Sequence, residues 1–280
     1  MSGPSLIERA LLYDRTIVIV ALGVVIAVSW IFVLAGAGTG MSAWDMTSWK
    51  MALGLSRPMS MAMPVDWTVG YAVIMFFMWW IMMVAMMLPS AAPMILLHAK
   101  VTRASSERTG GMFALAPTAL FTIGYLVAWA VFSLIAASLQ WAFEGLGVLS
   151  PMMMNSTNQL FAGVILLFAG AYQLTPLKQS CLRHCRSPVA FLSRHWRPGV
   201  TGAFRMGLDH GAYCLGCCRG LMAILFVGGI MNLYWIIGLA VLVLLEKLLP
   251  AGPALAYATG IIFLAGGIYL LASMPAAIPA

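Results

Sequence analysis

The chain has 280 residues, of which 62% are hydrophobic and only 8% are charged. This balance excludes an ordinary soluble domain, and the mean hydropathy of +0.97 is typical of an integral membrane protein. The net charge of +7 comes from basic residues in short connections, so we expect the lipid bilayer as surroundings and no nucleic-acid partner.

Seven apolar stretches are candidate membrane spans, because a helix of about 20 residues crosses a bilayer. The first, 16–38, is longer than the apolar region of an ordinary signal peptide, which indicates a retained N-terminal anchor. No internal repeat or second domain is evident, so residues 1–280 are expected to form one membrane domain, with the main bundle at 69–274. The sequence therefore predicts an all-α polytopic transmembrane bundle with spans at 16–38, 69–97, 114–140, 157–174, 212–229, 231–249 and 254–274.

Lysine and arginine are distributed unevenly between the connections that join these spans. Twelve of them fall on the side of the N-terminus, and only Lys50 and Arg57 fall on the opposite side. Because basic connections are retained in the cytoplasm, we expect a cytoplasmic N-terminus in a multi-pass protein of the inner membrane. Within the basic connection 175–211, the segment Pro188–Trp196 combines apolar side chains with an arginine and is expected to lie on the cytoplasmic membrane surface.

The fifth span opens with the run HGAYCLGCC, which contains three cysteines and a histidine. At about 100° per residue, Cys214, Cys217 and Cys218 share an arc of about 100° with His210 if the helix extends back that far. A reducing compartment disfavours disulfides there, and a helix N-terminus favours the thiolate form that binds metal. One cysteine in a membrane helix usually serves packing. Three within five residues instead favour a metal site, with thiol redox chemistry as the alternative.

The other two cysteines, Cys181 and Cys185, lie in the run CLRHC just after the fourth span. They are i, i+4 neighbours and share a helix face if this segment is helical. The sequence leaves open whether they join the Cys214 group or serve packing, because the 175–211 connection has the freedom to place them elsewhere.

Methionine is unusually abundant, with 22 residues in the chain. Several form a stripe on the second span, and this alone is typical of packing, because methionine fills irregular space in a core. Others gather in the connections that are expected to lie outside. Thioethers outside and across the membrane, with thiolates inside, suit a soft monovalent ion such as Cu(I). The stripe is Met75, Met78, Met82 and Met86, flanked by Met83 and Met87, and the outer methionines are Met59, Met61, Met63, Met152, Met153 and Met154.

Two further features lie near the expected depth of the cysteines. Pro89 and Pro93 remove backbone donors inside the second span, which indicates either a kink used for packing or an opening beside the site. Glu246 is expected near the cytoplasmic end of the sixth span. A carboxylate at that depth is paired or functional, and the alternatives are an ion pair with Lys247 and a role at the metal.

Four runs of residues carry a resemblance to a known family. The runs WWIMMVAMMLPSAAPM, AGAYQLTPLKQSCLRHC, HGAYCLGCCRGLMAILFVGGIMNLYW and LLEK resemble the DUF2182 family of predicted metal-binding integral membrane proteins, over about 70–275. The resemblance implies metal binding but names no reaction. The family often has tryptophan after the double cysteine, where this chain has Arg219. A charge therefore stands where an aromatic neighbour is expected.

The leading hypothesis is an inner-membrane protein that binds Cu(I), or alternatively zinc, and transports, stores or delivers it, with a metal-delivery or redox protein as its partner. The contrasting hypothesis is a membrane oxidoreductase or redox-centre subunit that uses the Cys214, Cys217 and Cys218 thiols. No motif for ATP hydrolysis or Ser/His/Asp catalysis is present, which makes an enzyme the less favoured class. If one site exists, its candidate ligands converge at the cytoplasmic end; they are Cys214, Cys217, Cys218, His210, Cys181, Cys185, Met83, Met86, Met87 and Glu246.

The predicted orientation can be tested by labelling single introduced cysteines in intact cells. We expect Ser193→Cys, in the connection 175–211, to react with a membrane-impermeant thiol reagent only after permeabilisation. The matched variant Ser156→Cys, in the connection 141–156, should react without it. The opposite order of labelling, scored against the unmodified chain, would overturn the orientation.

Overall fold

The computed structural model describes residues 6–38, 42–44, 46–47, 66–109, 115–151 and 154–274. Within these residues the chain is helical, and β-pairing is limited to one isolated bridge between Leu149 and Ser156. Several sequence predictions concern positions outside the described residues; these are Lys50, Arg57, Met59, Met61, Met63, Met152 and Met153.

A helix overlaps each of the seven predicted spans, although the observed bounds differ from the predicted ones by up to 13 residues. In chain order they are α1 (Leu6–Leu34), α3 (Val69–Thr109), α4 (Leu115–Gly145), α5 (Gln159–Leu174), α6 (Pro176–Arg186), α7 (Pro188–His195), α8 (Gly199–Ala223), α9 (Leu225–Gly228), α10 (Leu233–Leu248) and α11 (Gly252–Ala272). Five segments are long and apolar enough to cross a membrane: α1, α3, α4, α8 with α9, and α11; the bent pair α5–α6 would make a sixth. With 16 residues, α10 is shorter than the usual span, so helix length supports five or six crossings where seven were expected.

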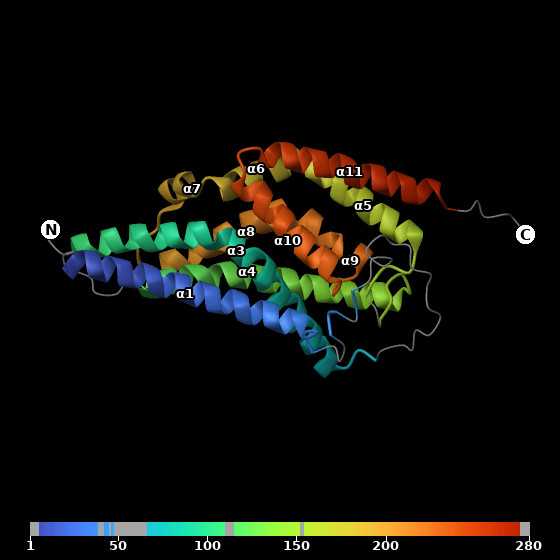
Figure 1. Ribbon diagram of the computed structural model, residues 1–280, viewed down its shortest axis with the longest axis horizontal. Coiled ribbons are helices and arrows are strands. Elements are labelled where there is room, and N and C mark those ends of the chain that lie inside the picture. Colours follow the sequence, from blue (N-terminus) through green and yellow to red (C-terminus); the bar gives the residue numbers. More distant parts are fainter. Residues whose placement is uncertain are drawn as a thin grey trace, which may run out of the picture.

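Helix α8 is the central element of the bundle. It packs most extensively against α4, and it also contacts α6, α5 and α10. Helix α3 packs against both α4 and α1, while α5 and α11 form a second closely packed pair. Figure 1 shows α1 along one edge of the bundle and the α5–α11 pair along the other. The cysteines of α8 lie among these helices, in its second half, since Cys214 follows the first residue, Gly199, by 15 residues. The prediction that they lie at a helix N-terminus is therefore wrong, because α8 begins well before the apolar run.

Small residues allow the backbones of α4 and α8 to approach closely. A Cβ atom added to Gly207 would collide with the carbonyl oxygen of Phe121, and one added to Gly124 would collide with the carbonyl oxygen of Phe204. Glycines in this position let membrane helices pack backbone against backbone. As a result, the aromatic side chains of Phe121 and Tyr125 in α4 contact the face of α8 that carries the cysteines.

The sharp bend between α5 and α6 has a local cause in the sequence Thr175–Pro176. The residue before a proline is disfavoured in helical conformation, and Thr175 is accordingly extended, with φ −71° and ψ 145°. Its hydroxyl oxygen accepts a hydrogen bond from the backbone N–H of Lys178 at 3.2 Å and so caps α6. The two helices meet at 63°, which turns α6 across α8.

Helix α3 runs without interruption through Pro89 and Pro93. Figure 1 shows that α3 changes direction part-way along its length. Near the prolines, the carbonyl of Met87 accepts hydrogen bonds from the hydroxyls of Ser90 at 2.8 Å and Tyr125 at 3.2 Å. Side chains from α3 itself and from α4 therefore both bond to the backbone of α3 in this region.

The expected surface segment Pro188–Trp196 contains the short helix α7, and two of its apolar side chains face the protein, whereas Val189 is exposed. Phe191 and Leu192 are buried, and the ring of Phe191 contacts that of His210 at a centroid distance of 5.3 Å. These two side chains therefore pack on the protein, and the position of the segment at the cytoplasmic membrane surface stays a prediction.

The close packing of α4 on α8 predicts that two glycine substitutions differ in their effect on stability. Gly207→Ala should destabilise the protein by about 1–3 kcal/mol, because the new methyl group overpacks the interface. Gly238→Ala is the matched control, since a Cβ atom there meets nothing within 4 Å. Thermal unfolding of detergent-purified protein checks the difference. Equal midpoints for the two variants would contradict the proposed role of Gly207.

Candidate metal centre

The cysteines of α8 occupy one buried face of a continuous helix. Helix α8 includes His210, as the one-face arrangement required, and His210, Cys214, Cys217 and Cys218 are all buried while Arg219 is exposed. The sulfur atoms of the three cysteines lie within 4.8 Å of one another, and those of Cys217 and Cys218 are 3.2 Å apart. This is a compact group of soft donors.

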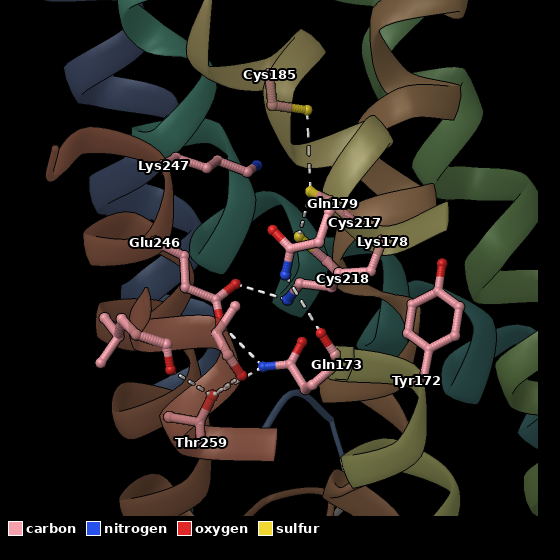
Figure 2. Close-up of polar contacts among 12 residues, drawn as sticks. Tyr172, Gln173, Lys178, Gln179, Cys185, Cys217, Cys218, Glu246, Lys247 and Thr259 are labelled. Atoms are coloured by element: carbon pink, nitrogen blue, oxygen red, sulfur yellow. Dashed lines mark hydrogen bonds and ion pairs between the residues drawn. The ribbon is translucent and has the colours of Figure 1, made fainter. Parts of the chain in front are cut away.

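The bend at the start of α6 brings one further cysteine to this group. The Sγ atom of Cys185 lies 3.8 Å from that of Cys217, and Figure 2 shows the two sulfurs facing each other across the helices. Cys181 contacts α8 elsewhere, because its Sγ atom lies against Gly216, about 100° around the helix from Cys217. The structure thus brings Cys185, and not Cys181, toward the predicted site. All five cysteines are free thiols.

His210 lies one helical turn before Cys214 in an aromatic environment. Its ring centroid is 5.7 Å from that of Tyr125 and 6.1 Å from that of Phe121. Its Nδ1 atom is buried and has no hydrogen-bond partner among the described residues. Most buried ring nitrogens have a hydrogen-bond partner, so an unpartnered one is unusual. In the neutral tautomer with the proton on Nε2, His210 Nδ1 could accept a hydrogen bond or bind a metal ion.

The three candidate methionines, Met83, Met86 and Met87, are all buried in α3. One link between α3 and the cysteines runs through the backbone of Met87. The Tyr125 hydroxyl lies 3.2 Å from its carbonyl oxygen and 3.2 Å from the Sγ atom of Cys214. Met87 is therefore one side chain away from the thiols, and the predicted proximity of this part of α3 is found.

A lysine that the sequence did not single out as a site residue contacts the cysteines directly. The Nζ atom of Lys247, in α10, lies 3.0 Å from Cys214 Sγ and 2.9 Å from the hydroxyl oxygen of Ser90. The residue is 6% exposed, so little water competes for this ammonium group. A cation in such a position stabilises negative charge on the thiols.

Glu246, the neighbour of Lys247 in sequence, contacts a different set of residues. Its carboxylate accepts hydrogen bonds from Lys178 Nζ at 2.7 Å and Gln173 Nε2 at 2.9 Å, and all of these side chains are buried. Figure 2 shows Lys178 and Gln173 both pointing toward this carboxylate. The expected ion pair with Lys247 is not formed, because consecutive residues of a helix point in different directions.

Arg219, which stands where an aromatic residue was expected, lies on the ring of Tyr172. The guanidinium carbon is 4.6 Å from the ring centroid, a cation–π contact. The Tyr172 hydroxyl in turn donates a hydrogen bond to the carbonyl of Gly216. The charge thus covers an aromatic side chain of α5 and does not point into the buried group of Cys214, Cys217 and Cys218.

Comparison with known proteins assigns the chain to a family. Residues 76–270 match a family model that is described as PpoB2, copper chaperone. The chain belongs to this family. The expected metal-binding membrane family is thereby confirmed as a copper-related one, under the name PpoB2 instead of DUF2182. No curated protein and no solved structure matches the chain. The family and the buried group of Cys214, Cys217 and Cys218 fit copper binding.

The contacts of Glu246 predict a structural role that can be separated from metal binding. Glu246→Ala should destabilise the protein by about 3–5 kcal/mol, because it leaves Lys178 buried without its counter-ion. The double variant Lys178→Met, Glu246→Leu should recover most of this stability and keep its copper. Thermal unfolding and elemental analysis check both effects. Copper loss in the stable double variant would show instead that Glu246 is a ligand.

Proposed function

We propose that this protein is a copper chaperone of the inner membrane that holds Cu(I) on the thiolates of Cys214, Cys217 and Cys218 and delivers it to a partner protein. The observation that carries the proposal is the group of three buried sulfur atoms within 4.8 Å of one another. Thiolate is a soft ligand and suits Cu(I), which accepts few ligands. The family of copper chaperones supports the same ion.

The difference in exposure between the four neighbouring thiols supports a delivery role. Cys214, Cys217 and Cys218 are buried, whereas Cys185 is partly exposed and lies 3.8 Å from Cys217. In our proposal Cu(I) enters or leaves by exchange between these two sulfur atoms. Each exchange forms one copper–sulfur bond as another breaks, so no oxidant or reductant is needed.

The inner membrane is proposed from the helices and the charge bias together. Several helices are long and apolar enough to cross a bilayer. The excess of lysine and arginine on the side of the 175–211 connection favours the cytoplasm for that side, which would put the cysteine group near the inner surface. We further propose that the DUF2182 resemblance and the PpoB2 match describe one family.

The proposal is tested by removing two sulfur donors. Cys214→Ser, Cys217→Ser should lose bound copper while the protein stays monodisperse, because serine keeps the size of the side chain but not the soft donor. Cys181→Ser is the matched control and should keep its copper, since Cys181 lies against Gly216. The measurement is the copper content per chain of reduced, detergent-purified protein.

Two outcomes would contradict this function. Unchanged copper in the double serine variant would remove the site from Cys214 and Cys217. Reduction or oxidation of a quinone by the copper-free protein, lost in the same variant, would favour the membrane oxidoreductase. A copper chaperone should instead pass its Cu(I) to a soluble thiol acceptor with no change in the oxidation state of its cysteines.

A further inference from the structure

The ammonium group of Lys247 is directed at the thiols and has no carboxylate partner among its described contacts. Its hydrogen bonds go to Cys214 Sγ at 3.0 Å and to the hydroxyl of Ser90 at 2.9 Å. The hydroxyl is neutral, so it orients the ammonium without cancelling its charge. The ammonium charge therefore acts mainly on the thiol of Cys214 and on the thiols beside it.

The other charges near the centre are balanced or point away. Lys178 and Glu246 form a buried ion pair at 2.7 Å, so together they add no net charge. Arg219 is exposed and stacks on Tyr172, and it makes no described contact with the sulfur of Cys214, Cys217 or Cys218. Within the described part of the chain, Lys247 is thus the cation that contacts the cysteine sulfurs.

We propose that Lys247 determines the preference of the cysteine site for monovalent over divalent metal. This inference rests on the proposed function, since it concerns the same thiols. With any given number of thiolates, the Cu(I) complex carries one more negative charge than the Zn(II) complex. A fixed cation beside the complex therefore stabilises Cu(I) binding more than Zn(II) binding.

The surroundings of Lys247 make this effect large. The side chain is 6% exposed and Cys214 is fully buried, so solvent and salt screen the interaction weakly. Ser90 belongs to α3 and Cys214 to α8, so the ammonium is held between two packed helices. Its distance from the metal would change little when the metal binds.

The experiment compares two substitutions of similar length. Lys247→Met removes the charge, and Lys247→Arg keeps it. Dissociation constants for Cu(I) and Zn(II) are measured separately, by competition with chromogenic chelators on reduced, detergent-purified protein. We expect the ratio of Cu(I) to Zn(II) affinity to fall by at least about tenfold in Lys247→Met, and to stay near that of the unmodified protein in Lys247→Arg.

Failure of this inference is distinguishable from failure of the proposed function. A Lys247→Met protein that binds copper with an unchanged affinity ratio overturns the role of Lys247 but leaves the copper site intact. An equal fall in both variants also overturns it, because charge is then not the cause. If Lys247→Met does not fold, Lys247→Gln supplies the neutral side chain, since its amide can still bond to Ser90.

Discussion

The backbone of α8 lies against that of α4 at Gly207, and the arrangement of the cysteine group depends on this contact. The approach brings Tyr125 of α4 within hydrogen-bond distance of both Cys214 and the backbone of α3. It also fixes the rotation of α8, so that the thiols turn inward and Arg219 turns outward. Because packed helices resist rotation, the donors are held in place before any metal arrives.

Charged and polar side chains are buried around the cysteine face of α8, and two adjacent residues of α10 pair with them. Glu246 neutralises Lys178 at the bend between α5 and α6, while Lys247 reaches the sulfur of Cys214. One helix end thus supplies both a buried ion pair and a charge beside the cysteine group. A buried charge destabilises the fold unless it has a partner of opposite charge or a hydrogen bond. The contacts of Glu246 and Lys247 therefore depend on the position of this end of α10.

The sequence predicted most of the helices, because apolar length and periodicity are local properties. It also predicted that His210 and the cysteines from Cys214 onward share one face, since this follows from helix geometry alone. It could not place Cys185 beside Cys217, which depends on the angle at which α6 crosses α8. Nor could it tell that Lys247 faces the thiols, because this depends on the rotation of α10 about its axis.

Helix α6 is bounded by proline at both of its ends, after Thr175 and after Ser187. Each proline interrupts the backbone hydrogen bonding of a continuous helix, so these 11 residues form a separate rod. The rod carries Cys185, while the buried thiols belong to the central α8. The same rod carries Lys178, whose buried ion pair with Glu246 ties it to α10, so a tilt that lengthens the distance between Cys185 and Cys217 also strains this pair. The position of the partly exposed Cys185 is thus coupled to a buried ion pair in another part of the bundle, which lies outside the group of thiols.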